Sequence, residues 1–345
     1  MGTIITVHPS KDLIVEAVED EGRSIVVQQG DSPILGYSNA EGFEGYINVT
    51  IFGDHTVSLY KPQFPFVIAT DGVKILSSSI LQHQYFYTVL EKYKPIPQGY
   101  KRHFSILKEQ IANITVNKDE QKKIGEFFET IGDLITLHQR KYDALKTMKK
   151  TLLSKIFPKD GEDIPEIRFK GFTDAWEQRK LGALVQFVNG RAYKQEELLD
   201  IGKYKVVRVG NFNTNEKWYF SDLELETDKY MDDGDLLYLW ATSFGPVIWQ
   251  GEKAIFHYHI WKLKNFESLE KKYLYSFLEW DKNKISQNTN GSTMVHITKN
   301  MIEQRVIEYP TKSEQYKIGS LLESVDNLIT LHQRRSSRII GLSAA

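Results

Sequence analysis

The heptapeptide LITLHQR occurs twice in this chain, at residues 134–140 and at residues 328–334. The match continues on both sides without a gap: residues 120–141 read EQKKIGEFFETIGDLITLHQRK, and residues 314–335 read EQYKIGSLLESVDNLITLHQRR. Most differences between the two copies are conservative. A duplication of this kind constrains the fold strongly, because repeated sequence is expected to form repeated structural elements.

Both copies have the apolar spacing of a long amphipathic helix. Apolar and histidine side chains recur in alternating steps of three and four, which places them on one stripe of each helix. The stripe comprises Ile124, Phe128, Ile131, Ile135, His138, Tyr142 and Leu145 in the first copy, and Ile318, Leu322, Val325, Ile329 and His332 in the second. Pro158 ends the first helix, because proline cannot continue it.

Each stripe needs a partner surface to cover it. We expect the two helices to pack against each other antiparallel, in the manner of a coiled coil, so that the two halves of the chain are related by a pseudo-two-fold axis. His138 and His332 would then lie on the contact and fix its register, as a buried polar group can. The alternative is that each helix packs on its own neighbouring domain.

The two helices divide the rest of the chain. The predicted organisation is a first domain at residues 1–117, a central helix at 118–157, a linker rich in proline, glycine and acidic residues at 158–175, a second domain at 176–312 and a second helix at 313–345. Short apolar runs bounded by Gly, Asp or Pro predict strands, for example at residues 204–212, 235–241, 245–251 and 254–263. We therefore expect an α+β fold with two strand-rich domains separated by two long helices.

Composition narrows the class of protein. The chain has no cysteine, which excludes disulfides and thiolate chemistry and suits a cytoplasmic protein. It has no apolar run long enough for a membrane helix and no signal peptide at its start. Its net charge is −1, whereas a stand-alone nucleic-acid binder is often basic. If the chain contacts DNA, positive charge must be local, or a partner must supply it.

Catalytic motifs are missing from the sequence. There is no GxxxxGK[ST] loop, no GxSxG, no GxGxxG and no HExxH motif. His257 and His259 could hold a metal, since alternate residues of a strand share one face, but no third ligand is evident near them in the sequence. A structural or DNA-contacting role is favoured for both, and no catalytic or metal-binding residue is predicted.

Polar side chains gather beside aromatic residues in several predicted loops. Arg, Lys, Asn, Ser and Thr are the residue types that reach phosphates and base edges. The candidates for DNA contact are Lys101, Arg102, His103, Arg191, Tyr193, Lys194, Arg208, Asn211, Asn213, Thr242, Ser243, His257, His259, Asn290, Ser292 and Thr293. Surface loops are polar in any protein, so each loop alone is weak support, and only their occurrence on duplicated domains strengthens the case.

The order of these segments resembles a known family. The chain is similar to the specificity subunit of type I restriction-modification systems. The shared order is a domain, the helix EQKKIGEFFETIGDLITLHQRKYDALKTMKKTLLSKIFP, the segment AWEQRKLGALVQFVNGRAY, a second domain and a second copy of the helix motif. The resemblance covers nearly the whole chain. Its specific parts are the helix motif and the WEQRKLG segment.

The resemblance implies a function for the whole arrangement. Each domain would be a target recognition domain that reads one half of a bipartite site in double-stranded DNA. The helices would set the gap between the half-sites and dock two modification subunits, which use S-adenosylmethionine to methylate adenine N6 after flipping the base. Restriction subunits would use ATP and Mg²⁺ to translocate and cleave DNA. This chain would itself hold no cofactor and no active site.

The chain departs from the family pattern in two places. The first domain starts at Met1 without a visible counterpart of WEQRKLGALVQFVNGRAY, so we expect its first strand and loop to be absent. The second helix continues only as RRSSRIIGLSAA, which predicts a shortened helix and a shortened allele. A second hypothesis is a structural adaptor, whose duplicated helices bind protein partners without reading DNA.

Overall fold

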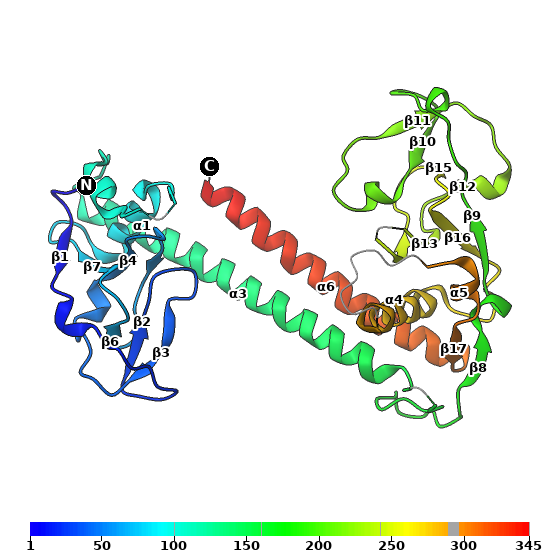
Figure 1. The fold of residues 1–345 in the computed structure, drawn as a ribbon, viewed down its shortest axis with the longest axis horizontal. Helices are drawn as coiled ribbons and strands as arrows, with labels where there is room; N and C mark the ends of the chain where they lie inside the picture. The colour runs from blue at the N-terminus through cyan, green and yellow to red at the C-terminus, as the bar shows by residue number, and fades with distance from the viewer. Residues whose placement is uncertain (100, 160, 242, 289–296, 345) are drawn as a thin grey trace. The chain divides into compact units, whose positions relative to one another are not determined.

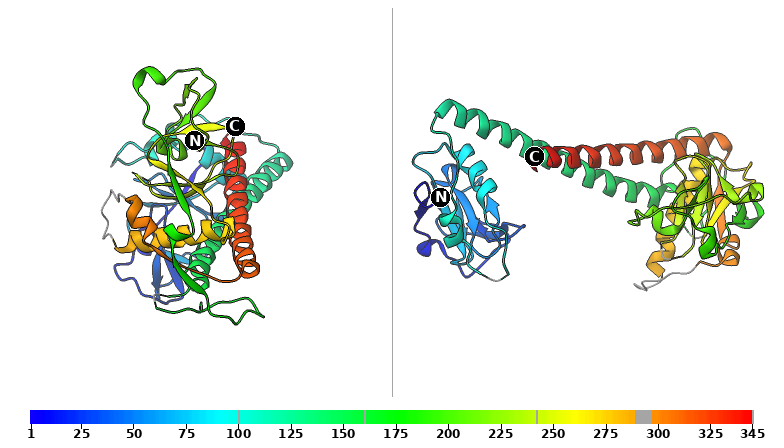
Figure 2. Two further views of the ribbon diagram at one scale, coloured as in Figure 1. Left: turned by 90° about the vertical axis from the view of Figure 1, so that its right-hand side faces the viewer. Right: turned by 90° about the horizontal axis from the view of Figure 1, so that it is seen from above.

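The computed structural model describes residues 1–99, 101–159, 161–241, 243–288 and 297–344. By its internal contacts the chain forms two compact units, Met1–His138 with Ser336–Ala345, and Gln139–Arg335. The two longest helices are α3, Lys118–Ile156, and α6, Lys312–Ala344, and each is drawn as one unbroken coil in Figures 1 and 2. No helix in these ranges is long and apolar enough to cross a membrane.

In its described residues, the first unit contains two small sheets and two short α-helices, besides parts of the long helices. One sheet has the order β1-β7-β4-β5 and the other the order β3-β2-β6. The elements are β1 Thr6–His8, β2 Ser24–Val27, β3 Ile34–Ser38, β4 Thr50–Gly53, β5 Leu59–Tyr60, β6 Phe66–Ile68, β7 Val73–Ser77, α1 His83–Tyr93 and α2 Phe104–Glu109. Two apolar clusters form its core, one between the sheets and one under α1 and α2.

The second unit contains three sheets, with the orders β11-β10-β15-β12, β14-β13-β16-β9 and β17-β8. Its strands are β8 Glu177–Lys180, β9 Gln186–Asn189, β10 Tyr204–Val207, β11 Tyr219–Ser221, β12 Tyr230–Met231, β13 Leu236–Leu239, β14 Gly245–Ile248, β15 Ala254–Phe256, β16 Ile260–Lys264 and β17 Val306–Tyr309. Its other helices are α4 Lys271–Asn288 and α5 Lys299–Glu303. The predicted strand-rich sheets and long helices are therefore present.

The two units share one pairing scheme. β2 pairs antiparallel with β3 and parallel with β6, and β10 pairs antiparallel with β11 and parallel with β15. β7 lies between β1 and β4, as β16 lies between β9 and β13. The duplication seen in the helices thus extends through the sheets. In this scheme β1 holds the position of β9.

The run at residues 254–263 is two strands and not the single strand predicted. β15 joins β10 and β12, whereas β16 joins β13 and β9 in a different sheet. Between them the chain turns, and the Ile260 N–H donates to the carbonyl of His257 at 3.0 Å. His257 and His259 therefore lie at a turn and not on one strand face. The reason is non-local pairing, which a continuous apolar run cannot reveal.

The identical residues of the repeated helix motif have a shared structural role. The buried side chains of Gln121 and Gln315 accept hydrogen bonds from the N–H groups of Gln82 and Glu270, where α1 and α4 begin. One turn later, a Cβ at Gly125 would lie 2.8 Å from the Tyr85 nitrogen, and at Gly319 the same distance from the Tyr273 nitrogen. The motif therefore attaches α3 to α1 and α6 to α4.

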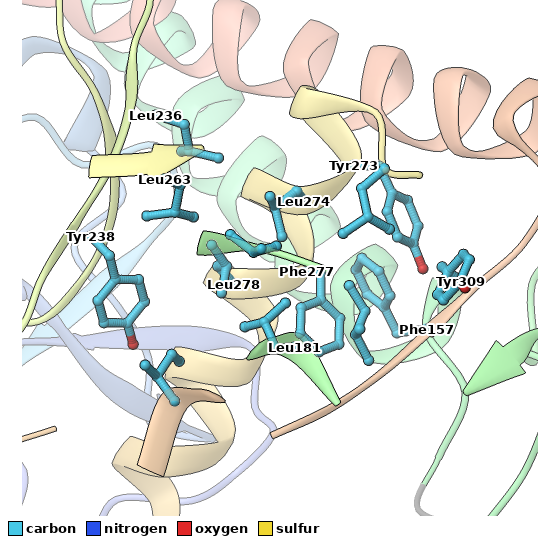
Figure 3. Close-up of a cluster of buried hydrophobic side chains, with 14 of the residues drawn as sticks. Phe157, Leu181, Leu236, Tyr238, Leu263, Tyr273, Leu274, Phe277, Leu278 and Tyr309 are labelled. Carbon is cyan, nitrogen blue, oxygen red and sulfur yellow. The ribbon is translucent and has the colours of Figure 1, made fainter. Parts of the chain in front are cut away.

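The apolar stripe of α6 begins inside the core of unit 2. Ile318 and Leu322 are almost fully buried and belong to the same cluster as Leu153 and Phe157 of α3 and its C-terminal end. Figure 3 shows Phe157 beside Tyr273 and Phe277 of α4, with ring centroids 5.6 and 5.9 Å apart. This part of the stripe therefore packs in the core of unit 2, together with the C-terminal end of α3.

Candidate nucleic-acid interface

Four predicted contact segments of unit 2 come together at one end of its sheets. The Arg191 N–H donates to the carbonyl of Phe256 at 3.1 Å, and the Tyr258 N–H donates back to the carbonyl of Arg191 at 3.1 Å. The His257 N–H donates to Val207, next to Arg208, and the Trp240 N–H donates to His259. Backbone hydrogen bonds therefore join segments that are far apart in the sequence, such as those of Arg191 and Tyr258.

Cations lie over aromatic rings in this region. The Arg208 guanidinium carbon is 4.1 Å from the ring centroid of Tyr219, and the Lys217 ammonium is 4.8 Å from the same ring. Hydrogen bonds from these two cations lower the pKa of the Tyr219 hydroxyl. Tyr219 is half-buried, and a cation held against a partly exposed aromatic ring can contact a phosphate while the ring stacks on a base or sugar.

His257 and His259 form part of an aromatic cluster with Trp240 and Tyr258. The ring centroids of His257 and His259 are 4.8 Å apart, and His259 lies edge-on to Trp240 at 4.8 Å. Burial, followed by the neighbouring His259 and Arg208, lowers the pKa of His257 to about 4. His257 is therefore neutral near pH 7, with one ring nitrogen as donor and one as acceptor. Within the part of the chain that the structure describes, no three metal-ligating side chains converge.

Some candidates are already engaged within the protein. The Asn211 side chain accepts from the Arg208 N–H and donates to the carbonyl of Lys217, so it shapes its own loop. The Arg191 guanidinium forms an ion pair with Glu197 at 2.5 Å. The Tyr193 hydroxyl donates to the carbonyl of Phe256. These three residues organise the surface.

Other candidates face outward. Lys194 is exposed, and Asn213 accepts a hydrogen bond from the Ser243 hydroxyl at 3.2 Å while remaining exposed itself. With Arg208 they form the accessible polar set of unit 2. The predicted candidates Thr242, Asn290, Ser292 and Thr293 lie outside the described residues.

In unit 1, the prediction for His103 is corrected. His103 is fully buried, its Nε2 accepts from the Gln98 N–H at 2.9 Å, and its Nδ1 lies 3.1 Å from the carbonyl of Asp54. Both ring nitrogens are used, so no DNA contact is open to it. Lys101 is exposed, and Arg102 is exposed and paired with Asp71 at 2.9 Å.

Sequence reasoning missed the aromatic side of the cluster. Lys217, Tyr219, Trp240 and Tyr258 were not among the candidates, although basic and aromatic residues alternate in EKWYF at residues 216–220. That alternation was the available signal. It could not be tied to Arg208 without the pairing of β10 with β11.

The repeated helices carry a second candidate surface. Leu134 and Leu137 of α3 are 41% and 46% exposed, and their equivalents Leu328 and Leu331 of α6 are 44% and 41% exposed. Near-identical residues with near-identical exposure in both copies fit two equivalent contacts. Most of the other stripe residues are half-buried: Ile131, Ile135, His138, Tyr142, Leu145, Ile329 and His332. Phe128 is 39% exposed, whereas Val325 is buried. Ile124 packs on the core of unit 1.

Residues 173–340 match the family model described as the type I restriction modification DNA specificity domain. The chain is similar to type I restriction-modification specificity proteins over this part of its sequence. Two relatives come from Methanocaldococcus jannaschii. The MjaVIII type I restriction enzyme specificity subunit is 24% identical over 242 residues, which cover 64% of this chain and 56% of the relative. The putative MjaX specificity subunit is 24% identical over 233 residues, covering 64% and 54%.

Solved structures agree at the level of the fold. The S subunit of a type I restriction-modification system from M. genitalium has a TM-score of 0.68 at 13% identity, covering 99% of this chain and 92% of that one. A chain from a structure on complex assembly and conformational transition of the type I R-M system has a TM-score of 0.51 at 14% identity, covering 86% and 80%. The chain spans a little over half the length of the curated relatives it matches.

Proposed function

We propose that this chain is a sequence-specific DNA-recognition subunit, in which each strand-rich domain reads one half of a bipartite site. The observation that carries the proposal is the cation and aromatic cluster around Arg208, Tyr219 and His257, inside the residues that match the specificity-domain family. Exposed arginine and lysine supply phosphate contacts, and neutral histidine and asparagine supply base-edge contacts. Unit 1 has the same strand pairing, which supports a second recognition domain.

On this proposal α3 and α6 pair antiparallel, related by a pseudo-two-fold axis, and set the gap between the half-sites. One contact that supports the pairing lies within unit 2, where the Lys149 ammonium binds Asp326 of α6 at 2.7 Å. The exposed leucines of the two LITLHQR copies would then dock two identical modification subunits, since each copy offers the same residues. Restriction subunits would join the same complex.

The chain would read DNA without catalysing a reaction. S-adenosylmethionine, ATP and Mg²⁺ would bind in the modification and restriction subunits, and the complex would work in the cytoplasm, where its DNA is found. Sharing the DNA contact with partner subunits also accommodates a specificity chain with a net charge of −1.

The test is a footprint of the chain together with its modification subunit. We expect two short protected sequences separated by a gap of fixed length and free sequence, and adenine methylation within the same sites. Protection that is continuous, or that ignores sequence, would contradict the proposal. The adaptor alternative predicts that reversing the charge of Arg191, Lys194 and Arg208 together leaves DNA binding by the complex unchanged.

A further inference from the structure

Unit 2 contains a groove of about 920 Å³ that is lined by the C-terminal half of α3, by α4 and by α6. A space of this size lies within the range of ligand sites in proteins. Lysine is the most frequent charged residue of its lining, which includes Lys146, Lys149, Lys150, Lys159 and Lys284. Of these, Lys159 pairs with Glu166 at 3.6 Å. The groove is separate from the candidate nucleic-acid interface, since no residue of the cluster around Arg208 lines it.

The carboxylates that line the groove are neutralised by one of its lysines. The Lys149 side chain is 13% exposed, and its ammonium lies 2.6 Å from Glu279 and 2.7 Å from Asp326. Within the part of the chain that the structure describes, no carboxylate pairs with Lys146 or Lys150. The groove therefore has an excess of positive charge, although the chain as a whole has a net charge of −1.

Lys146 and Lys150 are placed to share an anionic ligand. They lie four residues apart on α3, which puts them on the same face of the helix, and both are exposed. Like charges at this spacing repel each other and destabilise a helix. An anion that contacts both ammonium groups removes this repulsion. A chain of phosphates, with one negative charge on each nucleotide, supplies such anions along the length of a groove.

Two aromatic rings alternate with the lysines in the groove. The Lys146 ammonium is 5.2 Å from the ring centroid of Tyr142, and the Lys284 ammonium is 4.2 Å from that of Trp280. Both rings are half-buried, and Trp280 is held by Phe157, with ring centroids 5.2 Å apart. Lysines beside fixed aromatic rings are the features of sites for single strands, where phosphates meet the cations and unpaired bases stack on the rings. An acidic peptide would use the lysines alone.

We infer that this groove binds a single-stranded segment of nucleic acid, with phosphates on Lys146 and Lys150 and bases against Tyr142 and Trp280. A duplex cannot use the aromatic rings in this way, because the faces of its bases are covered by their neighbours in the stack. The groove reads no sequence, since stacking and phosphate contacts are open to every base. This site is additional to the proposed recognition of double-stranded DNA and does not depend on it.

The test uses the full chain and a fluorescently labelled oligothymidylate of about 12 nucleotides, a length within the site sizes of single-strand binders. We expect saturable binding by fluorescence anisotropy, and at least tenfold weaker binding for the double variant Lys146→Glu, Lys150→Glu. The slope of log affinity against log salt should become shallower by about 1.4, since each phosphate contact on a single strand contributes about 0.7. The matched control is Lys122→Glu with Lys123→Glu, which makes the same charge change at exposed positions of α3 and should bind within twofold of the natural chain. Oligouridylate of the same length shows whether RNA is preferred to DNA.

Ultraviolet crosslinking of an oligonucleotide that contains 4-thiothymidine locates the contact, and the crosslinks should map to Tyr142 or Trp280. Trp280→Leu, which keeps an apolar side chain against Phe157, should weaken binding about tenfold through the loss of stacking. Urea midpoints report whether each variant is folded, and the exposed lysine pair decides the question if Trp280→Leu is not.

Four results would overturn the inference. They are absence of oligonucleotide binding, equal binding by the two double-lysine variants, crosslinks confined to residues outside the groove, and equal displacement of the strand by an oligoglutamate of the same charge. The last result would show that the groove recognises negative charge and not a nucleic acid.

Discussion

Arg208 is positioned by two contacts and lies near a third residue, His257. Its backbone N–H binds the side chain of Asn211, its guanidinium lies over Tyr219, and the next strand places His257 close enough for Arg208 to lower the pKa of the imidazole. A side chain held in this way loses little rotamer entropy when it meets a ligand. Single residues of this cluster should therefore have measurable effects on DNA binding.

Replacing Arg208 by alanine should weaken specific DNA binding of the complex by about tenfold, since one positioned arginine contact contributes about 1–3 kcal/mol. If the arginine contacts a phosphate, the slope of log affinity against log salt should also fall by about one. The matched control is Arg179→Ala, which removes an exposed arginine of β8 paired with Glu177. Equal affinities for the two variants would contradict the role given to Arg208.

His257 predicts a pH dependence of stability. Its pKa is about 4 in the folded chain and 6.5 as a free side chain, so the unfolded state binds more protons between these values. Acidification from pH 7 to pH 5 should therefore destabilise the fold, and His257→Gln should lose less stability over the same range. Urea midpoints of both proteins at the two pH values test this. A parallel loss in both proteins would show that His257 is not responsible.

At the scale of elements, two glycines set how closely each long helix approaches its neighbour. A Cβ at Gly319 would lie 2.7 Å from the Cβ of Lys272, and a Cβ at Gly125 would lie 2.8 Å from the Cβ of Gln84. Neither distance is tolerated without a shift of the helix. The repeated KIG triplet is thus explained by packing of α3 on α1 and of α6 on α4.

Alanine at either glycine should destabilise the protein by about 1–3 kcal/mol, because backbone must move to admit the methyl group. Gly132 of α3 is the matched control, since a Cβ there would meet nothing within 4 Å. Gly132→Ala should be neutral or stabilising by up to about 1 kcal/mol, from helix propensity alone. Urea unfolding followed by circular dichroism gives the comparison. Equal changes in the free energy of unfolding for the alanine variants of Gly125, Gly319 and Gly132 would contradict the packing explanation.

At the scale of the whole molecule, the proposed spacer role of the helices can be tested by lengthening both together. Seven residues inserted after Asp133 in α3 and after Asn327 in α6 add two turns, about 10 Å, and preserve the apolar stripe. The recognised gap should then grow by about three base pairs, since DNA rises about 3.4 Å per pair.

The half-sites themselves should not change in this experiment. A methylation map of a strain that carries the lengthened chain reports both quantities at once. Inserting five residues instead is the control, because it turns the stripe away and should abolish methylation. New recognised bases with an unchanged gap would contradict the spacer role.

Sequence alone was sufficient for what depends on local periodicity and on repetition. The steps of three and four predicted the long helices, the two copies of LITLHQR revealed the duplication, and short apolar runs indicated strands. These patterns can be recognised from the sequence alone, because the helix and strand periods are properties of consecutive residues.

Tertiary structure decided what depends on pairing between distant segments. His103 and Lys101 are neighbours in one polar run, yet the fold buries the first and exposes the second. Residues 254–263 form one apolar run, yet its halves join different sheets and leave His257 at a turn beside Arg208. Likewise, the strand pairing shows which sheets of the two units correspond. Sheet register is set by partners far away in the chain, so no local pattern contains it.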